Sequence, residues 1–429
     1  MLLEVSIGEV IDKHIILEIK REKITDLNKK NEIIQELSVF KLNDLINKYD
    51  FYYNFLKYIN LQIWNMTDDL QKITYENETY AKKSYELFNL NQNRYRLKNI
   101  FNILLDSNLK EQKSVNSKIC NLIIDNEEII YDKIPEINHL FIDYDFINIK
   151  AQYKNILNKI SNCPTLIFYE ELPDSEINIF LNELTLDNNI RDIFDNTPLS
   201  YKFAGKLGDF IQTLSIVNEK FYETGKKGII YIHKNETWSN GLQNTYNDTY
   251  SVIKSQRYVK DYKIFNNERI DIEGDVWFFN PLLYNANWAM IFNDTFNIDW
   301  GKRKWIDVKI DEKWKDVVLI NEMHYRRADT INFSGIKEKF SKIIFIGYDK
   351  KSYDLFKQQT KLDIPWYVPT SFEDLCIAVN SCSLLVGGLS AILTIGHATH
   401  KKRIIGLKKN LKDNVHNINL DKFMENVYY

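Results

Sequence analysis

A short apolar segment that breaks into a glycine turn constrains the fold of this chain more than any other feature. Residues 202–211 are Lys-Phe-Ala-Gly-Lys-Leu-Gly-Asp-Phe-Ile, and an amphipathic run follows them. A strand, a tight glycine turn and a helix that starts at an acid are how open α/β sheets build a site at a strand's carboxyl end. Gly205 and Gly208 allow a ligand to approach the backbone closely, and Asp209 is expected in the helix's first turn, facing that crevice. We therefore predict a ligand site here, with Lys206 as a further contact.

A second turn of this type lies near the C-terminus. The apolar segment Leu384–Val386 leads into Gly387 and Gly388, and Ser390 is placed to cap the next helix. A helix N-terminus with small residues, here Ser390 and Ala391, offers N–H groups to an anion such as a diphosphate. Because each turn follows a parallel strand, we expect both to face one cleft. On local sequence alone, a purely structural turn is an equally good interpretation.

Composition excludes several classes of protein. With 429 residues, 44% of them hydrophobic, the chain can bury sizeable cores and is not disordered. A net charge of -3 argues against a dedicated nucleic-acid binder. Four scattered cysteines indicate a reducing compartment. No uncharged apolar run reaches the length of a membrane span, and no basic leader precedes an apolar core, so we expect a cytoplasmic protein without a transmembrane segment.

The spacing of apolar residues divides the chain into four expected domains. Residues 1–118 show helical spacing, which predicts a helical bundle or hairpin whose helices cover 6–37, 51–70 and 80–105. Residues 119–200 predict a small α/β linker domain. Residues 201–312 and 313–429 each follow a β-α pattern, which predicts two Rossmann-like halves facing across a cleft. The predicted fold class is therefore α/β.

Some elements are predicted from short apolar runs alone. In the linker domain these are a hairpin, a strand and a helix, at 122–124 with 129–131, at 139–142 and at 174–184. In the first Rossmann-like half they are two further strands, at 276–279 and 305–308. The tryptophans at 238, 277, 288, 300 and 305 are expected to pack in the core of that half, and stacking on a sugar acceptor is the alternative.

At the level of motifs, the C-terminal part resembles a family of enzymes. The turn Gly205–Asp209, followed by residues 345–347, 372–378 and 387–398, resembles heptosyltransferase-type glycosyltransferases of the GT-B fold over about 201–429. The resemblance implies that Asp209 is the general base and that donor phosphates rest on the C-terminal turn. Leu389 stands where that family typically has an acid, and residues 392–394 replace its usual small residues and histidine.

A transfer of this kind needs a group that takes a proton and groups that stabilise a diphosphate. Asp209 would deprotonate an acceptor hydroxyl, while Arg326 and Arg327 would stabilise a diphosphate leaving group. His324, beside the arginines, is a candidate donor contact, and a loop histidine without a role in binding is the alternative. An enzyme of this type needs no metal or other cofactor. The alternative for the arginine pair is a surface cluster balanced by neighbouring acids.

The resemblance implies an inverting, metal-independent glycosyltransferase that moves a sugar from a nucleotide-diphosphate donor to a glycan or glycolipid acceptor. A glycolipid acceptor would place it at the inner face of a membrane. Residues 4–20 and 96–114 resemble short, uncharacterised bacterial and viral proteins, which implies no activity; this helical part is a candidate surface for a homo-oligomer or a protein partner.

Two alternatives stay open. One is a non-catalytic assembly protein on a degenerate transferase fold, which Leu389 favours and the intact Gly-x-x-Gly-Asp turn opposes. The other is a metal-dependent transferase that uses Asp143 and Asp145, because an Asp-x-Asp after an apolar segment can hold Mn²⁺ against a diphosphate. The alternative for those two acids is a turn whose carboxylates face water.

Overall fold

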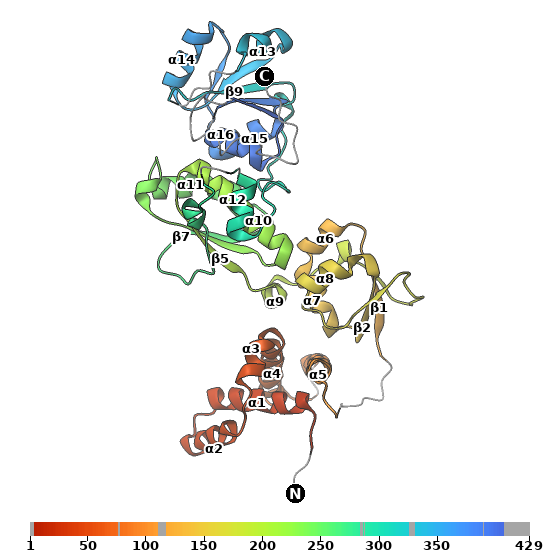
Figure 1. Ribbon diagram of the computed structural model, residues 1–429. Coiled ribbons are helices and arrows are strands. Elements are labelled where there is room, and N and C mark those ends of the chain that lie inside the picture. Colours follow the sequence, from red (N-terminus) through yellow and green to blue (C-terminus); the bar gives the residue numbers. More distant parts are fainter. Residues whose placement is uncertain are drawn as a thin grey trace. The chain divides into compact units, whose positions relative to one another are not determined.

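The computed structural model describes residues 4–75, 78–109, 117–283, 286, 288–325, 331–388 and 390–406. The chain divides into two compact units, Met1–Asp195 and Asn196–Tyr429, which run from red to yellow and from green to blue in Figure 1. Helices and three parallel sheets confirm the predicted α/β class. Among the described residues, no helix combines the length and the apolarity that crossing a bilayer requires.

The first unit begins with helices, as the apolar spacing predicts. They are α1 (Ile7–Lys23), α2 (Leu27–Ser38), α3 (Asn43–Lys48), α4 (Asp50–Leu70) and α5 (Glu78–Leu104). The first expected helix, 6–37, is in fact two. Ile24 adopts an extended backbone, and the Asp26 carboxylate then accepts hydrogen bonds from two backbone N–H groups to cap α2. The apolar spacing does not identify Asp26 as an N-cap, so it joins α1 and α2 into one helix.

A four-stranded sheet completes the first unit. Its strands are β1 (Ile119–Ile123), β2 (Phe146–Lys150), β3 (Leu166–Tyr169) and β4 (Asn178–Phe180), all parallel, in the order β3-β2-β1-β4. Short helices connect them: α6 (Glu127–Asp132), α7 (Ile134–His139), η1 (Leu140–Ile142), η2 (Ala151–Tyr153), α8 (Lys154–Ile160), η3 (Leu181–Glu183) and α9 (Asn188–Phe194).

Three predictions for this sheet are wrong. The expected hairpin does not form, because Asn126 caps α6 and turns 129–131 into helix. Residues 139–142 lie at the end of α7 and in η1, where Pro135 in the first turn favours the helix. Residues 174–184 form β4 and η3 rather than a helix. Short apolar runs fit either element, and pairing in the sheet decides between them.

The helices and the sheet of the first unit share an aromatic contact. The rings of Phe55 in α4 and Phe194 in α9 lie 4.6 Å apart, edge to face. Tyr52 donates a hydrogen bond to the Asn162 carbonyl. The predicted helical and linker domains thus pack together within one unit.

The second unit opens with a parallel sheet in the order β7-β6-β5-β8. The strands are β5 (Leu199–Phe203), β6 (Gly228–Ile232), β7 (Val259–Ile264) and β8 (Ile272–Glu273), with α10 (Leu207–Thr224), α11 (Leu242–Lys254) and α12 (Trp288–Phe296) as the main helices. The expected strand at 276–279 is a 3-10 helix, η5 (Val276–Phe279), and 305–308 form no strand.

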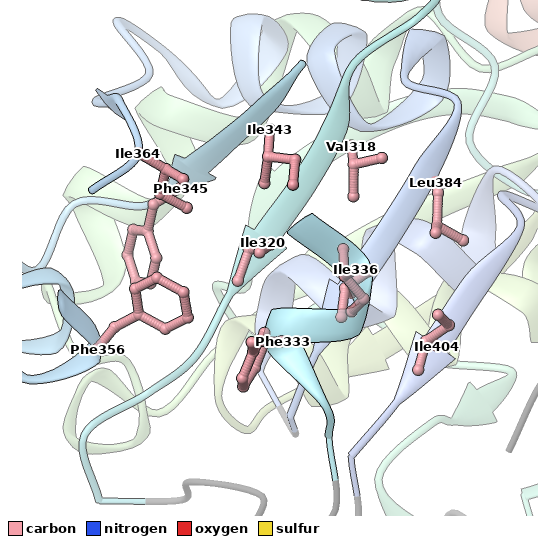
Figure 2. Packing of buried hydrophobic residues seen from close by; sticks show 11 residues of the cluster. Val318, Ile320, Phe333, Ile336, Ile343, Phe345, Phe356, Ile364, Leu384 and Ile404 are labelled. Atoms are coloured by element: carbon pink, nitrogen blue, oxygen red, sulfur yellow. The ribbon is translucent and has the colours of Figure 1, made fainter. Parts of the chain in front are cut away.

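The second sheet of this unit has the order β11-β10-β9-β12-β13. Its strands are β9 (Val318–Asn321), β10 (Ile343–Ile346), β11 (Trp366–Tyr367), β12 (Leu384–Gly387) and β13 (Arg403–Ile405). The helices are α13 (Phe333–Lys339), α14 (Lys350–Thr360), α15 (Phe372–Ser381) and α16 (Ala391–Ala398). Figure 2 shows apolar side chains from four of these strands packing beneath α13 and against Phe356 of α14. Continuous apolar strands covered by helices are typical of parallel sheets.

The two halves of this unit are joined through their helices. α10 of the first half packs on α16 of the second. Within the first half, the indole N–H of Trp305 donates to the Ile211 carbonyl of α10, 2.7 Å away. The backbone N–H groups of Trp305 and Ile306 bond the Ala398 carbonyl. These contacts explain why 305–308 form no strand, since the backbone groups that a ladder would need are used to tie the halves together.

In each sheet of this unit, the first strand lies between the second and the fourth. β5 pairs with β6 on one side and β8 on the other, and β9 pairs likewise with β10 and β12. The connections after these neighbouring strands run to opposite faces, which opens a crevice at their carboxyl ends. The fold thus predicts two such crevices, one after β5 and β8 and one after β9 and β12.

Candidate functional site

A cavity of about 490 Å³ lies at these two switch points of the second unit. Most of its wall comes from the four segments that follow β5, β8, β9 and β12, with β10, α14, Ser239 after β6 and Leu375 of α15 adding the rest. Both crevices therefore open into one space. A volume of this size is typical of small-molecule sites.

The turn after β5 brings an acid to the cavity. Gly205 has a φ of +118°, a conformation that side chains rarely adopt, and its N–H donates to Thr237 Oγ1 at 3.2 Å. Asp209 follows in the first turn of α10, half-buried, and its Oδ2 accepts from the Lys206 N–H at 3.4 Å. Lys206, Gly208 and Asp209 all line the cavity.

The turn after β12, in the second half of the unit, contacts the turn after β5. A Cβ on Gly208 would lie 3.3 Å from Thr394 Oγ1 and 3.5 Å from Ala391 Cα, so the first turns of α10 and α16 are in contact. Ser390 caps α16 by accepting from the Leu393 N–H at 3.2 Å. Ser390 and Ala391 line the cavity. The structure thus brings residues of both glycine turns together.

Gly387 and Gly388 shape the end of the strand rather than the cavity wall. A Cβ on Gly387 would lie only 1.9 Å from the carbonyl oxygen of Asn321 in β9. The Gly388 N–H donates to that same carbonyl at 3.3 Å. The glycines let β12 approach β9 closely and place the start of α16 above it.

Aromatic side chains of η5 and α12, two of them tryptophans expected in the core, form another wall. Trp277 and Phe278 of η5 stack with ring centroids 3.8 Å apart, and Trp288 of α12 meets Trp277 edge-on. All three line the cavity. Phe278 also reaches the glycine turn, since a Cβ on Gly205 would lie 3.5 Å from its Cζ. Because the sequence pattern predicts a strand at 276–279, it does not indicate that these side chains line a cavity.

His324 is held beside the cavity by α14. Its Nδ1 lies 3.0 Å from Asp349 Oδ2 and its backbone N–H donates to Ser352 Oγ at 2.9 Å. The Ser352 hydroxyl, and after it His324, lowers the pKa of the Asp349 carboxyl. Asp349 and Ser352 line the cavity, together with Met323 and Tyr325. The other predicted donor contacts, Arg326 and Arg327, and the departure at Leu389 lie outside the described residues.

The two acids of the metal alternative belong to the first unit and are engaged there. Asp145 accepts from Arg96 Nε at 3.3 Å and from the Lys118 N–H at 2.8 Å. Asp143 Oδ2 lies 3.5 Å from His139 Nδ1. Within the part of the chain that the structure describes, no three metal-ligating side chains gather in one place.

His397 of α16 makes the stability of the protein depend on pH. Its buried side chain forms part of the cavity wall. Burial is the main cause that lowers the pKa of His397 well below 6.5, and the nearby charges of Arg403 and His400 lower it further. The unfolded chain therefore binds a proton that the folded one does not, and stability is lost as the pH falls below 6.5. We expect urea denaturation to give a lower free energy of unfolding at pH 5.5 than at pH 7.5. In His397→Gln the decrease should be smaller; an equal decrease in both proteins would contradict this assignment.

Comparison with protein-family models gives no match, nor does comparison with curated protein sequences. Among solved structures, a glycosyl transferase family 9 protein from Veillonella parvula has a TM-score of 0.35 and 11% identity, covering 49% of this chain and 80% of its own. E. coli heptosyltransferase WaaC with ADP-2-deoxy-2-fluoro heptose has a TM-score of 0.31 and 8% identity, covering 49% and 88%. E. coli ADP-heptose lps heptosyltransferase II has a TM-score of 0.27 and 9% identity, covering 72% and 90%. The assignment of two Rossmann-like halves rests on the strand order of this chain itself.

Proposed function

We propose that this protein is a glycosyltransferase that moves a sugar from a nucleotide-diphosphate donor to a hydroxyl of a glycan or glycolipid. One observation carries the proposal: Asp209, after β5, and the N-terminus of α16, after β12, line one cavity. A carboxylate that can take a proton and a helix end that can hold an anion are the two groups that the reaction needs.

The transfer is a single displacement at the anomeric carbon. Asp209 takes the proton of the acceptor hydroxyl as its oxygen bonds the anomeric carbon. The bond from that carbon to the diphosphate oxygen breaks, and the electron pair leaves with the diphosphate. Attack opposite to the leaving group inverts the configuration of the sugar. The N-terminus of α16, with about half a positive charge, would stabilise the departing diphosphate.

Arg326 and Arg327 are proposed to bind that diphosphate. A guanidinium forms charge-assisted hydrogen bonds with phosphate oxygens, so Arg326→Ala or Arg327→Ala should weaken nucleotide binding by about 1.5–3 kcal/mol. Isothermal titration calorimetry measures this directly. Lys342→Ala is a suitable control, because that exposed side chain pairs only loosely with Asp316, at 3.8 Å. Unchanged affinity in both arginine variants would reassign the pair to the surface.

A thermal-shift screen of nucleotide-diphosphate sugars tests the proposed function. A ligand that binds the folded state at 100 times its Kd stabilises it by about 2.7 kcal/mol, which raises the melting temperature measurably. We expect one nucleotide class to do so, equally in EDTA and in Mn²⁺. A shift that requires Mn²⁺ and is lost in Asp145→Asn would favour the metal-dependent alternative. A shift without any transfer would favour the assembly protein.

A further inference from the structure

Three side chains in the cavity wall each carry a buried polar atom without a hydrogen-bond partner among the described residues. These atoms are Oε1 of Gln212 in α10, Nε1 of Trp277 in η5 and Oδ1 of Asn321 at the end of β9. The side chains belong to residues only 5%, 2% and 4% exposed. Buried polar groups are nearly always satisfied, because an unmade hydrogen bond is costly. Three such groups around one cavity indicate a ligand that completes their bonds.

Their positions place this ligand group beside Asp209. Gln212 follows Asp209 by three residues on α10, so both side chains lie on the same face of the helix. Trp277 is stacked on Phe278, which lies against Gly205.

Asn321 completes the set from the other half. Its Nδ2 donates to the Ile346 carbonyl at 2.8 Å. That bond fixes the orientation of the amide, so the oxygen of Asn321 is the atom left to accept.

The chemistry of the three atoms selects the ligand group. Two amide oxygens need hydrogen-bond donors, and an indole N–H needs an acceptor. Ionised phosphate offers acceptors only and would face the amide oxygens without a proton between them. A sugar hydroxyl both donates and accepts, and the C–H face of a sugar ring packs well on an exposed aromatic surface such as Phe278, which is 37% exposed.

We propose that Gln212, Trp277 and Asn321 bind the hydroxyl groups of a sugar ring placed beside Asp209, an inference that rests on the proposed glycosyl transfer. The ring belongs either to the nucleotide sugar or to the acceptor. These residues are binding residues that determine which sugar fits, distinct from the base and from the diphosphate contacts.

The test uses Gln212→Met, which keeps the length of the side chain and removes its amide. Calorimetry compares ADP with ADP-glucose, UDP with UDP-glucose and GDP with GDP-mannose on the full chain. If the donor supplies the ring, the gain in affinity from the sugar should fall about tenfold, while the affinity for the diphosphate alone stays the same. Trp277→Phe should act in the same direction.

The acceptor is tested by saturation-transfer-difference NMR with free glucose, galactose and mannose. If the acceptor supplies the ring, sugar signals seen with the wild-type protein should be lost in both variants while the calorimetric ratio is unchanged. If both measurements are the same in wild-type and variant proteins, or if no sugar gives a signal by either route, the inference is wrong. If nucleoside diphosphates fail to bind the wild type, the proposed function fails instead, and the NMR arm still decides this inference.

Gln256→Met is the matched control. Gln256 is 4% exposed, and its amide bonds the carbonyls of Val252 and Asp307 and the Asp307 N–H. Its loss should lower the melting temperature and leave sugar binding intact. Gln212→Met removes an unsatisfied oxygen, so the melting temperature should stay the same or rise. A large loss of stability in Gln212→Met would show a structural amide and contradict the proposal.

Discussion

Asp209→Asn is expected to reduce sugar transfer by on the order of 10²–10⁴-fold, the usual contribution of general base catalysis. The amide has the shape of the carboxylate and can still accept the hydrogen bond from the Lys206 N–H. It cannot take a proton from the acceptor. Donor affinity and the free energy of unfolding should therefore change little, and the loss should appear in kcat.

The measurement is release of nucleoside diphosphate in the presence of acceptor, with donor binding measured separately by calorimetry. If Asp209 only stabilises the first turn of α10, its charge contributes about 0.3–1 kcal/mol to stability. In that case Asp209→Asn would show full activity and a slightly lower melting temperature. That outcome would remove Asp209 from the mechanism.

Gly387→Ala is expected to have the largest effect on stability. The new Cβ would lie 1.9 Å from the Asn321 carbonyl oxygen and 2.9 Å from the carbonyl carbon, and both are backbone atoms of a paired strand. β9 and β12 would have to separate, which typically costs about 1–3 kcal/mol or more. Because the N–H of Gly388 also bonds this carbonyl, the start of α16 should move and nucleotide binding should weaken.

Gly208→Ala provides the comparison for this prediction. Its Cβ would meet Thr394 Oγ1 at 3.3 Å, a contact with a side chain that can give way, and alanine favours a helix. The free energy of unfolding should change by less than about 1 kcal/mol. Chemical denaturation of both variants measures the difference. Equal stability of the two variants would mean that β9 and β12 tolerate separation.

The glycine turns could be located from the sequence because their signals are local. A short apolar strand, glycines and an acid or a capping serine specify the turns after β5 and β12 without reference to the rest of the chain. The β-α alternation then predicts parallel strands, whereas their order in each sheet had to come from the structure. The rule that ligands bind at the carboxyl ends of parallel strands predicted one cleft for both turns, and the packing of α10 on α16 brings them together.

Other parts of the site depend on contacts that no local pattern encodes. The aromatic residues at 276–279 favour a strand, but Trp277 packs against Phe278, Trp288 and Phe292, and the segment forms a 3-10 helix. Packing of this kind overrides strand propensity. The segment 305–308 likewise ties the two halves together instead of joining a sheet.

The buried amides had a weaker signal that could have been used. Asn321 ends an otherwise apolar strand, and Gln212 directly follows Phe210 and Ile211 in α10, three residues after Asp209. A polar side chain inside an apolar run must find a partner, and a ligand is one possibility. The sequence alone does not show which polar residues are satisfied by the protein, so the choice required the structure.

The most direct test of the central claim is a crystal structure of the protein with the nucleotide sugar that gives the largest thermal shift. We predict the diphosphate at the N-terminus of α16, beside Ser390 and Ala391, and the anomeric carbon within the cavity, facing Asp209. A nucleotide bound outside this cavity, or one whose sugar points away from Asp209, would contradict the account.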